Sequence, residues 1–300
     1  MASTKTYFPQ EFLDKYSSFL GKGWEEFFAT ISKKQPKCFW VNTAKSTPAE
    51  IIESLSKKGV KFSQLAFDEH AFFIEMEKPG DLEEYKFGKI SLQEKAAMMP
   101  AAALAPKKGD KVLDACAAPG MKTLQLSNFV GAKGKVIACD VNSERFKFLC
   151  STISKFGLAN VEAIRCDFRN LSKKGMKFDK VLLDAPCSSE GLVRKDFDAL
   201  RGWSLDLVKR KSEEQKKLII SAFDLLKEGG EMVYATCSFA PEEDEDVVRY
   251  LLMQRQNAKV IPVELTGIKI RDDYLCSDCV RLYPQDNDTQ QFFFAKIKKE

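Results

Sequence analysis

A short stretch at residues 110–123 constrains the fold of this chain of 300 residues more than any other. It reads Asp-Lys-Val-Leu-Asp-Ala-Cys-Ala-Ala-Pro-Gly-Met-Lys-Thr, which is typical of a buried strand that runs into a tight turn and then a helix. The strand closes at Asp114, and Pro119 with Gly120 permits a sharp change of direction. Because the first amides of a helix are free to bind polar groups, the turn predicts a ligand site.

The spacing within this turn narrows the class of ligand. It lacks the Gly-x-Gly-x-x-Gly pattern of dinucleotide sites and the Gly-Lys-Ser/Thr ending of phosphate loops, which disfavours bound NAD or ATP. In open α/β sheets an acidic residue about 20 positions further on binds a ribose diol, and Asp140 closes the next apolar run at that place. A methyl-donor nucleoside fits this turn better than NAD or ATP does. The alternative is an ordinary strand-to-helix turn of an α/β protein.

Strand and helix patterns alternate from this stretch onward, which predicts an α/β fold with a doubly wound, mostly parallel sheet. The expected strands are 111–115, 135–139, 161–166, 179–184 and 231–236, and the expected helices are 121–130, 143–156 and 207–228. A helix near 242–256 and strands at 260–263 and 292–297 follow. This pattern is that of a Rossmann-like domain over residues 91–300.

Residues 1–90 form a separate region in this prediction. Apolar spacing at 8–33 indicates two short amphipathic helices, and the segments 38–42, 61–65 and 71–74 are typical of strands. Thr47 caps a helix that has Pro48 at its first position. The result is a small α+β unit, whose aromatic side chains either stack on RNA bases, as small sheets do, or face the unit's own core.

The border between the two regions has its own signals. The polar stretch from Pro79 to Gly88 predicts a linker. Ser91 then predicts a helix start, with Ser91 as the cap and Glu94 at the third helical position.

Composition limits the location and the partners of the protein. The first thirty residues show no leader pattern, and no apolar run reaches the roughly 20 residues that span a membrane. The net charge of +4 is carried mostly by lysine, which permits a polyanionic partner. The nine cysteines are scattered and odd in number, which predicts reduced thiols and a cytoplasmic protein.

Histidine and zinc chemistry are disfavoured. Cys276 and Cys279 form the one close pair, but no second pair follows, so we expect two unliganded cysteines rather than a metal site. His70 is the only histidine, and it precedes an alternating strand, which favours a structural role. Any nucleophilic or acid–base chemistry therefore depends on cysteine, aspartate, lysine or water.

Acidic residues follow four successive strands, namely Asp114, Asp140, Asp167 and Asp184. The carboxyl ends of parallel strands lie at one edge of the sheet, so these carboxylates are expected to line one crevice. There Asp140 would bind ribose hydroxyls and Asp167 the adenine amino group, while Asp184 would reach the reacting centre. The alternative for each aspartate is a helix-capping role.

Two cysteines occupy equivalent places beyond strand ends. Cys187 lies in Asp-Ala-Pro-Cys-Ser-Ser and Cys237 in Ala-Thr-Cys-Ser. We expect both to project into the crevice, and the alternative is two buried structural cysteines. A helix expected to open at Pro241 would lower the pKa of the Cys237 thiol and make it a better nucleophile.

Three motifs together resemble a known family. They are Asp-Ala-Cys-Ala-Ala-Pro-Gly-Met-Lys-Thr, Asp-Ala-Pro-Cys-Ser and Ala-Thr-Cys-Ser-Phe-Ala-Pro-Glu-Glu-Asp-Glu, in this order. The chain resembles the RNA cytosine-5 methyltransferases of the Fmu/Sun family over residues 90–300. A weaker resemblance at 38–66 covers that family's small RNA-binding segment.

The resemblance implies S-adenosylmethionine as cofactor and RNA as partner, tRNA being favoured. Cys237 is then the nucleophile, Cys187 helps to release the product, and Asp184 binds the N3 edge of the base. The implied cofactor-binding residues are Cys116, Ala117, Ala118, Pro119, Gly120, Met121, Lys122, Asp140, Arg145, Asp167 and Asp184.

The chain also departs from the family pattern. Family members commonly have Pro-His and Asp-Gly before the last strand, where this chain has Pro284-Gln285 and Gln290-Gln291. Met121 replaces a common glycine. Basic residues on one predicted helix either face RNA phosphates or form a solvated surface; they are Lys209, Arg210, Lys211, Lys216 and Lys217.

Several functions stay open at this point. The leading one is methylation of carbon 5 of a cytosine in structured RNA, most simply tRNA, by a monomer that needs no metal and no membrane. Ribosomal RNA is the alternative substrate. A DNA-type arrangement would instead use Cys187, which follows Pro186, as nucleophile. A cofactor-binding RNA assembly factor without turnover is the non-enzymatic alternative.

Overall fold

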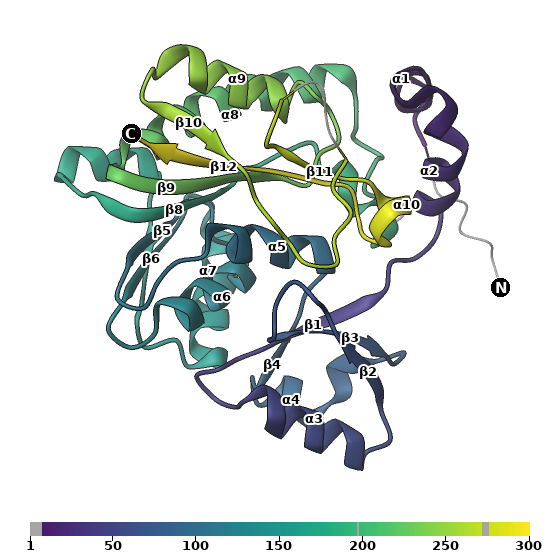
Figure 1. Ribbon diagram of the computed structural model, residues 1–300, viewed down its shortest axis with the longest axis vertical. Helices are drawn as coiled ribbons and strands as arrows, with labels where there is room; N and C mark the ends of the chain where they lie inside the picture. Colours follow the sequence, from purple (N-terminus) through teal and green to yellow (C-terminus); the bar gives the residue numbers. More distant parts are fainter. Residues whose placement is uncertain (1–7, 197, 272–275) are drawn as a thin grey trace.

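Two β-sheets of unequal size organise the described part of the chain, which comprises residues 8–196, 198–271 and 276–300 of a computed structural model (Figure 1). The small sheet lies at the bottom of the view and the large sheet runs across its middle. The predicted combination of a small α+β unit and a larger α/β unit is confirmed.

The small sheet has the strand order β2-β3-β1-β4. Its strands are β1 (Lys37–Val41), β2 (Lys61–Gln64), β3 (Ala71–Glu75) and β4 (Ile90–Leu92). Helix α3 (Pro48–Lys57) packs on it and begins with a capping box, in which Thr47 and Glu50 bond each other's backbone amides.

The predicted linker and the helix start at Ser91 are wrong. Residues 79–88 contain a 3-10 turn, η2 (Pro79–Asp81), and helix α4 (Glu83–Lys86). Ser91 lies in β4, where it pairs with Trp40, and helix α5 (Lys95–Leu104) begins later with Glu94 as its cap. Strand pairing in the sheet therefore outweighs the local capping signal of Ser91.

Aromatic side chains of the small sheet form its core. The rings of Phe39 and Phe72 stack with their centroids 5.1 Å apart, and both are buried. Trp40 is buried on the other face, between the small sheet and the large unit. For these three rings the core alternative is correct, and base stacking is excluded.

The large sheet has the order β10-β12-β9-β8-β5-β6-β7, with β11 paired to β12. The strands from β9 to β7 run parallel, and β12 is antiparallel to β9. Their bounds are β5 (Lys111–Asp114), β6 (Lys135–Asp140), β7 (Val161–Arg165), β8 (Phe178–Asp184), β9 (Leu226–Thr236), β10 (Ala258–Ile261), β11 (Val280–Leu282) and β12 (Phe292–Lys299). The predicted mostly parallel sheet is confirmed.

Helices cover both faces of this sheet (Figure 1). Helices α5, α6 (Met121–Val130) and α7 (Ser143–Phe156) lie below it in the view, while α8 (Leu205–Asp224) and α9 (Glu245–Gln254) lie above it. Adjacent strand residues point to opposite faces, so Val112 packs in the core near α5 and α6, and Leu113 in the core near α8 and α9.

Two element ends differ from the sequence patterns. Helix α8 ends at Asp224, because β9 already begins at Leu226 and pairs there with Phe178. Helix α9 begins at Glu245 rather than near residue 241, and the residues before it form turns.

The two predicted amino-terminal helices are present as α1 (Gln10–Leu20) and α2 (Trp24–Ile31), joined by the 3-10 turn η1 (Gly21–Gly23). They pack against the large unit and lie away from the small sheet (Figure 1). Phe12 and Phe27 share one core with Trp203 and Phe239. The division of the chain at residues 90 and 91 stays a prediction.

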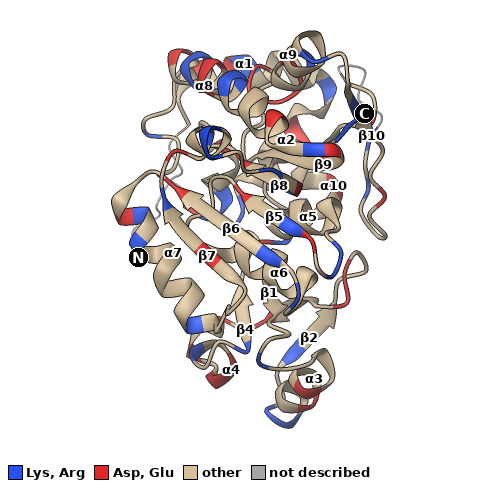
Figure 2. Cartoon of the chain, turned by 90° about the vertical axis from the view of Figure 1, so that its left-hand side faces the viewer, with Lys and Arg blue, Asp and Glu red and all other residues tan. Residues whose placement is uncertain are grey.

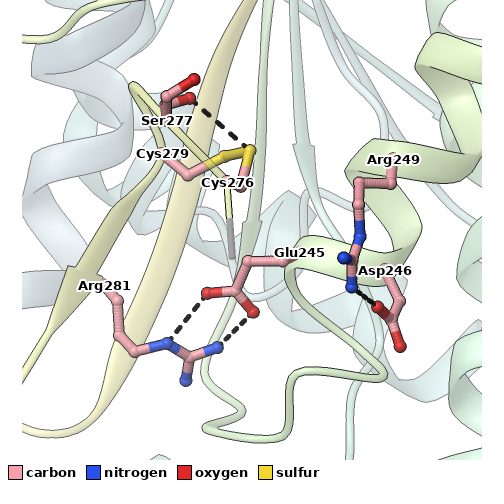
Figure 3. Close-up of a disulfide and its surroundings, with 7 residues drawn as sticks. All are labelled: Glu245, Asp246, Arg249, Cys276, Ser277, Cys279 and Arg281. Carbon is pink, nitrogen blue, oxygen red and sulfur yellow. Dashed lines mark hydrogen bonds and ion pairs between the residues drawn. A yellow bond between two sulfur atoms is a disulfide. The ribbon is translucent and has the colours of Figure 1, made fainter. Parts of the chain in front are cut away.

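Cys276 and Cys279 are joined by a disulfide (Figure 3), so the expectation of reduced thiols is wrong for this pair. A turn with a positive φ at Asp278 brings the two Cα atoms to 5.6 Å, within the usual disulfide range. The other seven cysteines are free.

The basic residues of α8 alternate with acidic ones (Figure 2). Lys211 is paired with Glu214, and Lys216 with Glu213. This pairing is typical of a solvated helix face.

In the described ranges, no helix is both long and apolar enough to cross a membrane.

Candidate functional site

The register of the parallel strands places the proposed site residues at one edge of the sheet. Asp114 of β5 pairs with Ala138 of β6 and with Leu182 of β8. Asp184, at the end of β8, pairs with Ala235 of β9. The loops after these strands therefore emerge side by side, and they contain Cys116, Cys187 and Cys237.

The loop between β5 and α6 is tightly fixed. Ala117 donates its amide to the Cys139 carbonyl at 2.8 Å, and Ala118 donates to Asp140 at 3.3 Å. Gly120 has a φ of 108°, and a Cβ there would lie 2.9 Å from a methyl carbon of Thr152. Only glycine fits this close approach of the turn to α7.

Lys122 and Asp184 form an ion pair beside this loop, with 2.7 Å between Nζ and Oδ2. Burial alone would lower the pKa of Lys122, but the charge and hydrogen bond of Asp184, together with the charge of Asp114, outweigh burial and the pKa is raised. The ammonium therefore stays charged at the edge of the sheet, and Asp184 keeps a fixed orientation.

Asp140 is buried at the end of β6, and both oxygens of its carboxylate have polar partners. Its Oδ1 accepts from the Asn142 amide at 2.9 Å, and its Oδ2 lies 3.4 Å from the Arg145 guanidinium. Arg145 also donates to the Ala118 carbonyl at 2.7 Å. The next residue, Val141, exposes 72% of its surface and presents an apolar side chain just beyond the end of β6.

Asp167 has the geometry of a cap. It begins the 3-10 turn η3 (Phe168–Lys174), accepts the amide of Arg169 at 3.0 Å and also binds the Arg169 guanidinium. The hydrogen bond from Arg169 lowers the pKa of Asp167. An adenine amino group would have to share this carboxylate with Arg169.

Asp114 is buried, and only one of its oxygens has a partner within the described ranges. Its Oδ2 accepts from the Thr123 hydroxyl at 2.7 Å, while Oδ1 has none. Burial raises the pKa of Asp114 to about 7. A buried acceptor without a partner is costly, which indicates that a donor from a ligand or water completes it.

The two loop cysteines meet. The Sγ atoms of Cys187 and Cys237 lie 2.9 Å apart, and each side chain is partly exposed. The hydrogen bond to Cys237, together with burial, raises the pKa of Cys187 well above its usual value. Cys187 therefore remains a thiol at neutral pH.

The expected helix start at Pro241 is wrong, because α9 begins only at Glu245. The Glu243 and Asp244 carboxylates before it are buried. Burial raises the pKa of Glu243 to about 7. Glu243 accepts hydrogen bonds from the Ser188 amide at 3.0 Å and the Ser238 hydroxyl at 2.9 Å, so it ties the two cysteine loops together.

A second set of buried polar residues was missed by the sequence patterns. Arg281 of β11 binds Glu245 of α9 (Figure 3) and donates to the Phe239 carbonyl at 2.7 Å. Glu190 lies in a short 3-10 turn, η4 (Glu190–Arg194), and is also buried. The only available signal was at Arg281, a charged residue inside an apolar run, and Glu190 carried none.

The residues that depart from the family pattern are mostly buried. Gln291 donates its side-chain amide to the Glu190 carbonyl at 3.3 Å, and the Gln290 backbone amide donates to Glu94 at 3.1 Å. Both belong to the packing around η4 and α5. Neither amide atom of Gln285, in helix α10 (Pro284–Asn287), has a partner in the described chain.

Comparison with known proteins identifies the family. The profile described as 16S rRNA methyltransferase RsmB/F matches residues 101–298, and the profile described as the N-terminal domain of 16S rRNA methyltransferase RsmF matches residues 8–95. The chain belongs to the RsmB/F family. Members are S-adenosylmethionine-dependent RNA cytosine-5 methyltransferases, so the chain is an enzyme of this class. The resemblance seen in the sequence motifs is confirmed.

Two relatives show how far the similarity extends. A tRNA (cytosine(49)-C(5))-methyltransferase of Pyrococcus abyssi is 36% identical over 289 residues, covering 92% of each chain. A ribosomal RNA small subunit methyltransferase F of Shewanella piezotolerans is 36% identical over 285 residues, covering 92% of this chain. This chain spans only 60% of the Shewanella protein.

Solved structures share the fold of this RsmB/F-family protein. A methyltransferase homolog protein from Pyrococcus horikoshii is 29% identical and matches with a TM-score of 0.87 over all of both chains. NSun6 from the same organism is 21% identical and matches with a TM-score of 0.88, covering 98% of this chain and 99% of that one.

We expect Asp114 to make the stability of the protein depend on pH. Its pKa is 3.8 in an ordinary setting and about 7 in the fold, so between these values the folded state holds a proton that the unfolded state has lost. The resulting stability is complete below about pH 4 and is lost as the pH rises to 7. Urea unfolding at pH 4, 5, 6 and 7 measures this for wild type and Asp114→Asn.

The asparagine variant cannot titrate at this position. The unfolding free energy of wild type minus that of Asp114→Asn should therefore fall between pH 4 and pH 7, by about 1 to 4 kcal/mol. A difference that stays constant or rises over this range would contradict the raised pKa of Asp114.

Proposed function

We propose that this enzyme methylates carbon 5 of a cytosine in tRNA through a covalent adduct between Cys237 and carbon 6 of the base. The observation that supports it most strongly is the 2.9 Å distance between the Sγ atoms of Cys187 and Cys237 at the ends of neighbouring strands. One pyrimidine ring can touch both sulfurs there, with Asp184 on the same edge of the sheet.

The chemistry of cytosine requires such a pair. Carbon 5 is too electron-poor to attack a methyl group by itself, so the Cys237 thiolate adds to carbon 6 and makes carbon 5 an enamine-like nucleophile. Asp184 binds the N3 edge, where charge develops. After methylation a base removes the proton from carbon 5, the bond between sulfur and carbon 6 breaks, and the thiolate leaves.

Electrostatics favours Cys237 over Cys187 as the nucleophile. The raised pKa of Cys187 keeps its proton in place, which suits a group that assists product release. The Lys122 ammonium interacts electrostatically with Cys237. The DNA-type arrangement, with Cys187 as nucleophile, is therefore disfavoured.

The residues at this edge of the sheet fit S-adenosylmethionine, which would supply an electrophilic methyl group when bound. Asp114 offers an unpaired buried oxygen, Asp140 is placed for the ribose, and Val141 offers an apolar surface for the adenine. Asp167 would bind the adenine amino group. The remaining residues proposed to hold the cofactor are Cys116, Ala117, Ala118, Pro119, Gly120, Met121, Lys122, Arg145 and Asp184.

The names of the relatives point to two RNA substrates. The Pyrococcus abyssi relative is named for cytosine 49 of tRNA and is 36% identical to this chain, which makes tRNA the first candidate. The Shewanella relative is named for small-subunit ribosomal RNA and is also 36% identical. Ribosomal RNA is the second candidate because the two identities are equal. The monomeric state and the cytoplasmic location stay predictions.

The two cysteines should behave differently when each is replaced. Without Cys187 the product is released poorly, so Cys187→Ala incubated with RNA and cofactor should remain covalently attached to RNA. Cys237→Ala cannot form the bond and should neither attach nor methylate. Denaturing gel electrophoresis of labelled RNA reads both results, and Cys150→Ala, at an exposed free cysteine of α7, is the control. Attachment by Cys237→Ala but not by Cys187→Ala would favour the DNA-type arrangement.

The substrate is tested with unmodified transcripts. We expect bisulfite sequencing after incubation with wild type and cofactor to show 5-methylcytosine in tRNA and none in small-subunit ribosomal RNA. Cys237→Ala provides the background. Methylation of ribosomal RNA alone would overturn the choice of tRNA, and binding of cofactor without methylation of either RNA would favour the assembly factor.

A further inference from the structure

The turn η4 runs alongside the residues that carry Cys237. The Gly191 amide donates to the Cys237 carbonyl at 2.7 Å, and the Glu190 carboxylate accepts the Phe239 amide at 2.8 Å. The backbone on both sides of Ser238 is thus held from one short segment. A Cβ at Gly191 would lie 2.7 Å from the Cys237 carbonyl oxygen, so the contact has no room for a side chain.

Glu190 itself is oriented by two aromatic donors from other parts of the chain. The Tyr16 hydroxyl of α1 donates to Oε2 at 2.7 Å, and the Trp203 indole donates to Oε1 at 2.6 Å. All three side chains are buried. Burial and the neighbouring Glu190 charge raise the pKa of Tyr16, so the hydroxyl keeps the proton that it donates.

The amino-terminal helices are also fastened to η4 at its far end. Arg194 is buried and donates to the carbonyls of Lys33 and Lys34, which follow α2, and to the Thr289 carbonyl. In Figure 1, α1 and α2 lie beside the large unit, away from the small sheet. Contact with the small sheet therefore does not explain their position.

We propose that α1 and α2 position the nucleophile, with Tyr16 and Trp203 fixing Glu190 so that η4 holds the Cys237 loop in its reactive place. All three act as positioning residues: Glu190 bonds the Phe239 amide near Cys237, and Tyr16 and Trp203 act through Glu190. This inference rests on the proposed role of Cys237 as nucleophile.

The geometry explains why the hydrogen bond from Tyr16 to Glu190 matters for the reaction. If the Glu190 carboxylate loses one donor, it rotates toward its remaining donors. The Phe239 amide then no longer has an acceptor in a fixed position. A small displacement of an attacking atom lowers the reaction rate strongly while leaving ligand binding intact. The rate of adduct formation is therefore the quantity that Tyr16 controls.

Tyr16→Phe removes only the hydroxyl and keeps the ring in its core. We expect the single-turnover rate of methylation to fall roughly tenfold, with a larger fall for Tyr16→Phe combined with Trp203→Phe. The KM for RNA and the Kd for S-adenosylmethionine should stay at their wild-type values. In a Cys187→Ala background, the covalent complex should form more slowly by the same factor.

Ile31→Val, in the same core on α2, is the matched control, because it perturbs the packing without touching Glu190. A structural role alone would make both variants lose thermal stability and leave both single-turnover rates unchanged. A wild-type rate in Tyr16→Phe, a fall equalled by Ile31→Val, or a raised KM for RNA with an unchanged rate would each overturn the inference.

The Cys237→Ala variant distinguishes failure of the positioning role from failure of the proposed function. If Cys237→Ala is inactive while Tyr16→Phe reacts at the wild-type rate, the positioning role is overturned and the nucleophile stands. If Cys237→Ala still methylates RNA, both the proposed mechanism and the positioning role are overturned.

Discussion

The parallel pairing of β8 with β9 is the constraint on which the site depends. Its register sets Asp184 opposite Ala235, and the loops that follow therefore begin at the same height and bring Cys187 and Cys237 into contact. A slip of one residue would turn every side chain of a strand to the other face. The two sulfurs would then no longer meet, although each motif would be intact in the sequence.

Buried carboxylates hold these loops in place at a cost in stability. Glu190 and Glu243 are fully buried and take their hydrogen bonds from backbone and side chains of both cysteine loops. Removing a charge from water is unfavourable, and a set of well-directed donors compensates for it only if all are present. Burial of Glu190 and Glu243 therefore lowers the stability of the fold and at the same time fixes the arrangement of the two cysteines.

The sequence predicted those features of the fold and site that depend on short-range patterns and on strand direction. The alternation of elements predicted the parallel sheet, and the motifs that contain Cys187 and Cys237 predicted the family. Patterns failed where a distant partner decides the outcome. Ser91 carries a capping signal but pairs with Trp40 in a sheet. Glu243 lies in an acidic run that resembles a helix start but turns toward the cysteine loops. The contact of Tyr16 with Glu190 joins residues 174 positions apart, and no local pattern announces it.

The central claim is that Cys237, and not Cys187, bonds to carbon 6 of the base. RNA that carries 5-fluorocytosine tests it most directly, because the final proton cannot be removed from a carbon that bears fluorine and the adduct persists. Peptide mass mapping of the wild-type complex should find the nucleotide on Cys237, with Cys187 still open to alkylation after denaturation. A nucleotide attached to Cys187, or to neither cysteine, would contradict the account.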